Sequence, residues 1–573
     1  MSAVFDNASS RRPHALTILF ALLLLNVSVT FTNVWPTPAV TWTGALSIEL
    51  GLMLWVLLVL TRRGRPVRPA FIAMVSAVWA LLVFGRYADV TTPALLGRPI
   101  NLFWDVRYAK DVTAMFVQAA PLWRVMLAVG ALLLVVWAIF RLLRWSIRRI
   151  ALASADRQGH RRLVQLVALA LSLLFVGERA LDLRPTVLGF ATPVTHTYLQ
   201  QARLIRDAFG AAARQLPPTP PLNSDLSLVA GADVLLVFME SYGAITWQRD
   251  DLTARLAGAR AEFAAAIAGT GRSVVSAYVE SPTYGGSSWF AHISLLSGIE
   301  IRDPDANALL MAQRRETLVT AFARRGFRTV ALMPGLWQAW PEGAFYGFQA
   351  IYGGPQLAYT GPEFGWWALP DQYTLAKFDA LEMDRQPHRP TFVFFPTIST
   401  HAPFTPTPPF QPDWGRLLTD TPFDAAAVSE AWDRQPDWTN LSPSYGDAVA
   451  YDHTVLAGYL RKQVDRDLVL IVLGDHQPPA LVSGEGQPWD VPIHIIASRP
   501  EILERLRAFG FRDGLRPEAR ISKMHELLPV LLDAFGDRTP ETETLARRGV
   551  TAAGGQLPTR TPMVKLRPRA GAN

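Results

Sequence analysis

The sequence predicts two parts joined by a linker: an N-terminal domain of five transmembrane helices, and a C-terminal α/β domain whose mostly parallel sheet has helices on both faces. Three observations lead to this fold class. Apolar residues are concentrated in the first third of the 573-residue chain. A proline-rich stretch, QLPPTPPLN, follows that third. Beyond it, short β-rich runs alternate with helical patterns, as in domains built from strand–helix–strand units.

Five apolar segments are long enough, or nearly so, to cross the roughly 30 Å hydrocarbon core of a bilayer. They cover approximately residues 14–34, 43–61, 69–86, 121–143 and 162–182. A cleaved signal peptide is an alternative for the first segment, because Arg11 and Arg12 precede it. Four further segments follow, however, and no clear small-residue cleavage site ends the first. We therefore expect a retained helix and a transmembrane domain over residues 1–183.

Arginine clusters between these segments predict their orientation, because basic loops stay on the cytoplasmic side. The clusters comprise Arg11 and Arg12; Arg62, Arg63, Arg65 and Arg68; and Arg141, Arg144, Arg148, Arg149, Arg157, Arg161 and Arg162. They alternate with less basic connections. The loop 87–120 also carries basic residues on the outer side, where three aspartates dilute them. Five crossings from a cytoplasmic N-terminus place everything after about residue 183 outside the cytoplasm.

The overall composition argues against nucleic-acid binding and against a disulfide-stabilised external domain. A net charge of +7 is compatible with nucleic-acid binding. The arginine clusters flank the predicted membrane helices, however, so membrane orientation explains them and we expect no nucleic-acid partner. The chain has no cysteine. The external domain therefore has no disulfides and must be held by a hydrophobic core.

The connecting and terminal segments have distinct compositions. Residues 184–222 form a juxtamembrane segment in which 195–214 has helical apolar spacing with mixed charge. A coupling helix near the bilayer and an ordinary surface helix are equal alternatives there. QLPPTPPLN then predicts a stiff linker. The tail, residues 546–573, is rich in glycine, proline and arginine, so we expect it to be disordered and basic.

The external domain, residues 223–545, contains six β-rich runs. They are DVLLVFME (233–240), SVVSAYVE (273–280), RTVALMPG (328–335), TFVFFPTIS (391–399), LVLIVLGD (468–475) and VPIHIIAS (491–498). Nearly continuous apolar strands separated by helical patterns indicate a parallel sheet covered on both faces. In such sheets ligands bind at the carboxyl ends of the strands.

Polar side chains follow three of these runs. Glu240 follows VLLVFM, Asp475 and His476 follow LVLIVLG, and Thr400 and His401 follow TFVFFPTIS. The Asp475–His476 pair alone is also compatible with an ordinary turn. Polar side chains at the ends of three runs, however, together predict a site. Two carboxylates and an imidazole without thiols suit Zn²⁺ or Mn²⁺.

The stretch SPTYGGSSWFAHISLLSGI, residues 281–299, places two glycines and two serines before an apolar helical pattern. Serine is a favoured helix N-cap, so a purely structural role is one interpretation. A serine hydroxyl becomes a nucleophile when a base or a metal activates it. A divalent ion held by Glu240, Asp475 and His476 would supply that activation, with Ser288 as a further ligand, and the helix start would attract an anion.

These motifs resemble those of the alkaline phosphatase and sulfatase superfamily. The layout of five helices, a connecting segment and an outer domain is similar to lipoteichoic acid synthase and related membrane phosphoglycerol transferases. In SWFAHISLLSG the ten-residue spacing to Gly298 favours Ser288 over Ser287 as the nucleophile. VFMES matches the metal carboxylate motif at Glu240, and GDH matches the metal motif at Asp475 and His476. STHAPF matches the substrate histidine motif at His401.

The sequence also departs from the superfamily patterns. Ser241 stands where sulfatases have a second aspartate, and His292 where they have the arginine of the Cys-x-Pro-x-Arg signature. These departures favour a single-metal transferase over a sulfatase. The synthases hold the glycerol phosphate headgroup with a Trp-x-Arg pair, but Trp337 and Trp340 are followed by Ala339 and Glu342. Phosphoethanolamine transferases, a neighbouring branch, typically carry disulfides that this chain lacks.

The resemblance implies a membrane-bound, metal-dependent phosphotransferase. It would move a phospho-alcohol headgroup from a membrane phospholipid to an envelope glycan or lipid-linked acceptor through a covalent Ser288 intermediate. Phosphoglycerol is the headgroup that the resemblance favours. His401 would bind the phosphate or shuttle a proton. The ion would be Mn²⁺ or Zn²⁺, with Mg²⁺ as a third candidate. The expected location is the bacterial cytoplasmic (inner) membrane, with several crossings of the lipid bilayer and the catalytic domain on the periplasmic side.

Two other functions stay open. One is a metal-dependent phosphodiesterase or sulfatase-like hydrolase that passes the group to water, and the other is an inactive membrane scaffold. Among the remaining polar residues, we expect His453 and His494 to be structural. Tyr284 and Trp289 flank the predicted nucleophile and either line the donor site or only pack.

Overall fold

The computed structural model describes residues 15–34, 37–96, 100–106, 122–156, 159–180, 189–209, 215–337, 340, 343–365 and 369–536. The predicted disordered tail, residues 546–573, lies outside the described residues. So do Arg11, Arg12, residues 97–99 and 107–120 of the outer loop, and also Ala339 and Glu342.

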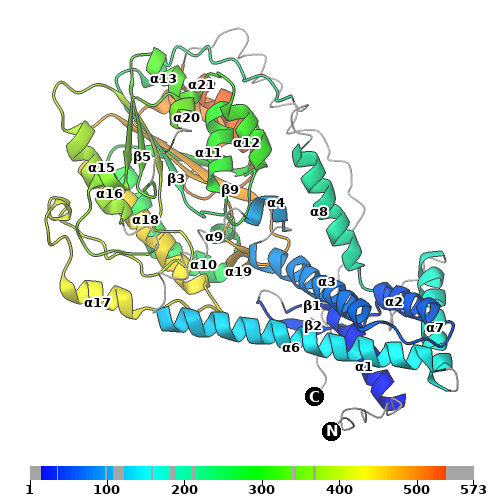
Figure 1. Ribbon diagram of the computed structural model, residues 1–573. Helices are drawn as coiled ribbons and strands as arrows, with labels where there is room; N and C mark the ends of the chain where they lie inside the picture. Colours follow the sequence, from blue (N-terminus) through cyan, green and yellow to red (C-terminus); the bar gives the residue numbers. More distant parts are fainter. Residues whose placement is uncertain are drawn as a thin grey trace, which may run out of the picture.

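All five predicted membrane segments contain helices, which gather on one side of the α/β domain (Figure 1). They are α1 (Ala15–Thr30), α2 (Ile48–Leu60), α3 (Pro69–Leu96), α6 (Leu122–Ala155) and α7 (His160–Ala180). Within the described residues, α3, α6 and α7 are long and apolar enough to cross a membrane, whereas α1 and α2 are shorter apolar helices. The structure thus contains three to five membrane-type helices.

Polar bonds connect the apolar helices to one another and to the segment that follows them. The Asn26 side chain donates to the Ala45 carbonyl at 2.8 Å and accepts from the Ser47 amide at 2.9 Å. Glu49 accepts from the Val194 amide at 2.6 Å, where helix α8 (Val194–Phe209) begins. The Tyr198 hydroxyl of α8 donates to the Leu81 carbonyl of α3 at 2.5 Å. The juxtamembrane helix is therefore bonded to two of the apolar helices.

A nine-stranded sheet forms the centre of the second part, in the order β10-β4-β9-β8-β3-β7-β5-β6, with β11 (Arg520–Lys523) beside β4. The six predicted runs form β3 (Asp233–Met239), β4 (Ser273–Glu280), β5 (Arg328–Met333), β7 (Thr391–Pro396), β8 (Leu468–Gly474) and β9 (Asp490–Ala497). Five adjacent strands run parallel to one another, in the order β8, β3, β7, β5 and β6 (Ala350–Gly353). The exceptions are β9, which is antiparallel to β8 and β4, and β10 (Arg512–Asp513), which is antiparallel to β4.

Helices cover both faces of this sheet, as Figure 1 shows. Alternate residues of β3 point into two separate cores: Val234, Leu236 and Phe238 into one, and Leu235, Val237 and Met239 into the other. The first core includes α11 (Ser288–Ser297), α13 (Leu318–Arg324), α20 (Pro500–Ala508) and α21 (Leu527–Phe535); the second includes α10 (Asp250–Gly269), α16 (Asp371–Phe378) and α18 (Ser442–Lys462). Every residue of β3 is buried. The predicted fold class, an α/β sheet with helices on both faces, is confirmed.

Gly474, the last residue of β8, allows a close approach of two backbones. A Cβ atom at this position would lie 1.9 Å from the Tyr242 carbonyl oxygen. We expect Gly474→Ala to destabilise the fold by about 3 kcal/mol or more, because backbone must move to make room. Thermal unfolding of the full chain in detergent measures this loss.

Gly258, exposed on α10 with open space around it, is the matched control for Gly474. Gly258→Ala should stabilise the protein by about 0.5–1 kcal/mol, because alanine favours the helix interior. Equal melting temperatures for the two variants would show that the approach at Gly474 is not constrained.

Candidate active site

Two neighbouring parallel strands bring three acidic and imidazole side chains to one edge of the sheet. Met239 at the end of β3 pairs in register with Gly474 at the end of β8, so Glu240 and Asp475 leave the sheet side by side. One potential ligand atom from each of Glu240, Asp475 and His476 lies within 4.8 Å of the others. All three residues are buried, with exposed fractions of 9%, 1% and 1%. The strand ends thus assemble the predicted metal-ligand group.

Ser288, the first residue of α11, points its hydroxyl into this group. Its Oγ donates to Glu240 Oε2 at 2.8 Å and lies 3.2 Å from His476 Nε2. The N-cap of α11 is Ser287, which has a φ of 63° and whose side chain makes no capping hydrogen bond. The Ser288 hydroxyl therefore contacts the candidate metal ligands, and the choice of Ser288 over Ser287 agrees with the geometry.

The loop before Ser288 is fixed to the segment that carries Asp475 and His476. The Ser281 hydroxyl donates to the Asp475 carbonyl at 2.5 Å, and the Gly285 amide donates to the Gln477 carbonyl at 3.1 Å. Gly285 and Gly286 have φ values of 65° and 141°, in the range that favours glycine. The two glycines let the loop turn so that Ser288 faces Glu240.

The donor set fits a divalent cation. His476 Nδ1 lies 2.7 Å from the Gln477 carbonyl, so in the neutral ring Nδ1–H donates there and the Nε2 lone pair faces Glu240 Oε1 at 3.3 Å. Asp475 Oδ1 accepts two backbone amides, whereas the buried Oδ2 has no hydrogen-bond partner. A lone pair and carboxylate oxygens facing one another repel unless a positive charge lies between them. Zn²⁺ and Mn²⁺ both accept such N and O ligands.

The electrostatics of the group without an ion point to the same need for positive charge. Burial lowers the pKa of His476, but Asp475 and Glu240 outweigh it and raise that pKa to about 9. Burial and the charge of Glu240 raise the pKa of Asp475 well above its ordinary value. A proton on His476 thus supplies part of the positive charge that the carboxylates require.

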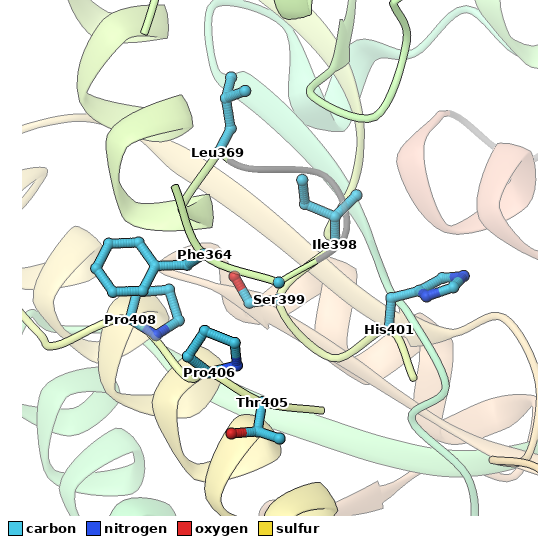
Figure 2. Close-up of a pocket in the computed structure, with 9 residues that line it drawn as sticks. Phe364, Leu369, Ile398, Ser399, His401, Thr405, Pro406 and Pro408 are labelled. Atoms are coloured by element: carbon cyan, nitrogen blue, oxygen red, sulfur yellow. The ribbon is translucent and has the colours of Figure 1, made fainter. Parts of the chain in front are cut away.

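His401 lies on the segment that follows β7, the other neighbour of β3. Its Nδ1 lies 2.8 Å from the Ala402 carbonyl. Interaction with His401 lowers the pKa of Glu240, as a smaller contribution than the interaction with His476. Among the described residues His401 is not one of the clustered metal-ligand candidates. His401 also borders a small pocket lined by Phe364, Leu369, Ile398, Ser399 and four other residues. Figure 2 shows the His401 ring pointing away from Phe364, Pro406 and Pro408.

His292 is a buried neighbour of the candidate site, to which the sequence assigned no role. It follows Ser288 by one helical turn and packs against the rings of Phe238 and Phe394 at 4.6 and 5.3 Å. Its buried Nε2 has no hydrogen-bond partner, and burial lowers its pKa to about 3. The signal in the sequence is the spacing of four from Ser288, which places both on one helix face.

The other singled-out residues have these contacts. His494 lies between the Tyr242 and Ser276 hydroxyls at 3.0 and 2.7 Å, and His453 Nδ1 lies 2.8 Å from the carbonyl of Val449 in its own helix. Both histidines have the buried, bonded environment expected of structural residues. Tyr284 is buried and its hydroxyl lies 2.5 Å from Ser483 Oγ, while the side chains of Trp289 and Trp337 are exposed.

Comparisons with known proteins agree with this architecture. The Sulfatase family profile matches residues 302–495, about a third of the chain, which includes His401, Asp475 and His476. No curated protein matches the chain.

Three solved structures are among those similar to this chain. The lipoteichoic acid synthase LtaP from Listeria monocytogenes is 13% identical with a TM-score of 0.37, over 58% of this chain and 78% of that one. The Streptococcus pyogenes phosphoglycerol transferase GacH, in complex with sn-glycerol-1-phosphate, is 14% identical with a TM-score of 0.37, over 61% and 84%. The C-terminal periplasmic domain of EptC from Escherichia coli is 14% identical with a TM-score of 0.34, over 56% and 86%.

The Sulfatase match lies within the α/β domain whose sheet edge carries the ligand cluster described above. The predicted resemblance to sulfatase-like proteins is confirmed over the matched residues. In this chain the domain is attached to an N-terminal part with at least three helices of membrane-spanning length.

Proposed function

We propose that the protein is a membrane-bound, metal-dependent transferase that moves a phospho-alcohol headgroup from a phospholipid to an envelope glycan or lipid-linked acceptor. Ser288 is the nucleophile and carries the headgroup between the two half-reactions. The observation that carries this proposal is the Ser288 hydroxyl, held 2.8 Å from Glu240 and 3.2 Å from His476 at the sheet edge. Phosphoglycerol is the headgroup we favour.

A contact between the two parts of the chain supports a lipid donor. Helix α3 packs against α19 (Ala480–Ser483), which begins four residues after His476. Ser483 in turn lies 2.5 Å from the hydroxyl of Tyr284, in the loop before Ser288. The nucleophile loop is thus two contacts away from an apolar helix of membrane-spanning length. This arrangement suits a substrate whose phosphate lies at a bilayer surface, and we place the protein in the bacterial inner membrane with this domain on the periplasmic side.

Glu240, Asp475 and His476 would hold the divalent ion, Mn²⁺ or Zn²⁺, with Ser288 beside them. The bound ion supplies Lewis acidity, which lowers the pKa of the hydroxyl and neutralises charge on the phosphoryl oxygens. Glu240 Oε2 orients the Ser288 hydroxyl through the 2.8 Å hydrogen bond. Burial of this group excludes water and strengthens each of its electrostatic interactions.

His401 is the proposed proton carrier. In the first half-reaction Ser288 gives its hydroxyl proton to Glu240 Oε2, the bond from Ser288 Oγ to phosphorus forms, and the bond from phosphorus to the diacylglycerol oxygen breaks. His401 Nε2 gives a proton to that oxygen, so diacylglycerol leaves as the neutral alcohol. In the second half-reaction Nε2 takes the proton of the acceptor hydroxyl, whose oxygen displaces Ser288 from phosphorus. Glu240 Oε2 returns the proton to the displaced Ser288 oxygen, and the cycle closes.

The test is peptide mass spectrometry of residues 281–299 after the full chain is incubated with Mn²⁺ or Zn²⁺ and vesicles that contain phosphatidylglycerol or phosphatidylethanolamine. A phosphoglycerol or phosphoethanolamine adduct on Ser288, with release of diacylglycerol, is the expected result and identifies the donor headgroup. Release of water-soluble headgroup phosphate without acceptor would assign a hydrolase instead. Metal-loaded protein that forms neither adduct nor product would assign an inactive scaffold.

A further inference from the structure

Two aspartates outside the metal-ligand group face each other behind the segment 397–401, which carries His401. Asp371 begins α16 and Asp452 lies in α18, and each has an exposed fraction of 1%. Tyr451 also faces both aspartates, and Tyr359 faces Tyr451. The remaining groups that face the pair are the hydroxyls of Thr397, Ser399 and Thr400 and the backbone amides of residues 398 and 399.

Asp371 acts as a hydrogen-bond acceptor for this segment. Its Oδ1 and Oδ2 accept from the Ile398 amide at 3.0 and 3.1 Å, and Oδ2 accepts from the Ser399 amide at 2.7 Å. A carboxylate that accepts several backbone amides is favoured in its ionised form. Asp371 therefore holds the backbone just before His401 through its negative charge.

Asp452 has the opposite environment. Neither of its oxygens has a hydrogen-bond partner, and the buried hydroxyls of Thr400 and Tyr451 have none either. Two carboxylates in a dry site cannot both stay ionised, so one of them retains a proton. Burial raises the pKa of Asp371 to about 6, while burial and the charge of Asp371 raise that of Asp452 well above its usual range. The proton therefore belongs on Asp452, where it becomes a donor toward Asp371.

We propose that Asp371 and Asp452 hold one proton between them, donated by Asp452 to Asp371, and that this hydrogen bond fixes the segment 397–401 and so positions His401. The same segment reaches the metal-ligand group, because Thr397 Oγ1 accepts from the Glu240 amide at 3.1 Å. Both aspartates are positioning residues, since they act through this segment. The proposal deepens the proposed function, because it rests on the role given there to His401.

The discriminating variant is Asp452→Asn, whose amide keeps a permanent donor toward Asp371 without a titratable proton. Asp452→Ala removes the donor. Amide hydrogen exchange of the 397–401 segment, compared at one pH, should match the wild type in the Asn variant and be faster in the Ala variant. Equal protection in all three proteins, or equal loss in both variants, would overturn the proposal. This readout needs no substrate, so it separates failure of the proposal from failure of the proposed transferase function.

The pH dependence of thermal stability tests the shared proton itself. A carboxyl whose folded-state pKa is raised keeps its proton above the unfolded pKa of about 3.9, so stability falls as pH rises from there through the folded pKa. The wild type should show this fall in stability. Asp452→Asn should lack the part of the fall that comes from loss of the shared proton. Parallel stability curves for the two proteins would overturn the shared proton.

Activity supplies the third readout. The fall of kcat toward alkaline pH should be larger in the wild type than in Asp452→Asn, because only the wild type can lose the shared proton. Asp452→Ala should lower kcat by up to about a hundredfold with little change in KM, because a small misplacement of His401 affects chemistry more than binding. An alkaline fall in the Asn variant that equals that of the wild type would contradict the proposal.

Discussion

Replacing Ser288 by alanine is expected to lower the rate of headgroup transfer by at least about a thousandfold, because the covalent route loses its nucleophile. The hydroxyl is the atom that faces Glu240 and His476, and no other described hydroxyl is placed between the same two side chains. Release of diacylglycerol from phospholipid vesicles under steady-state conditions measures this loss.

Ser287→Ala is the matched control, since it removes the neighbouring hydroxyl from the same turn. The Ser287 side chain makes no capping hydrogen bond, so its loss should change the rate by no more than about twofold. Similar losses in the two variants would mean that the turn, rather than the Ser288 hydroxyl, limits activity, and would remove the covalent mechanism.

Replacing Asp475 by asparagine should have opposite effects on the metal-bound and metal-free protein. Affinity for Mn²⁺ or Zn²⁺ should fall at least about a hundredfold, because a charged ligand becomes neutral. The metal-free variant should be as stable as the wild type or more so, because a buried oxygen without a partner no longer carries charge beside Glu240. Thermal unfolding with and without the ion, together with metal content after dialysis, measures both effects.

Asp533→Asn is the matched control for this experiment. Asp533 in α21 is also buried, and its two carboxylate oxygens also have no hydrogen-bond partner. Its replacement should leave the metal-induced rise in melting temperature unchanged. If Asp475→Asn keeps the same metal-induced rise as the wild type, the ion is not held at the end of β8.

The sequence was sufficient for the parts of the fold that follow from a local pattern. The runs that became β3, β7 and β8 are continuously apolar because both faces of the central sheet are covered, and that pattern predicts a parallel sheet. The same rule placed Glu240 beside Asp475, since parallel neighbours end at one edge. Strand β9 also has an apolar sequence, yet it runs antiparallel to β8, a direction that the apolar pattern does not encode. Short strands such as β6 carry too few residues for a pattern.

The site was predictable to the same extent. Ser288, Glu240, Asp475 and His476 each stand at a strand end or helix start, where the sequence signal is strong. His401 lies in the turn segment beyond Pro396, the last residue of β7. His292 and Asp452 lie inside helices, where a polar residue has no local mark of function. Their roles depend on what packs against them: Phe238 and Phe394 around His292, and Asp371 opposite Asp452. Such tertiary relations are not contained in spacing alone.

For the proposed transferase, the contact between α3 and α19 also determines whether the rate depends on the donor concentration in solution or in the bilayer. A catalytic domain on a free tether would sample donor molecules through a volume of solution set by the length of its linker. A domain docked on an apolar helix of membrane-spanning length stays at one height and meets only the lipids of its own leaflet. The rate should therefore follow the mole fraction of donor lipid in the bilayer, and dilution of intact vesicles should leave turnover unchanged.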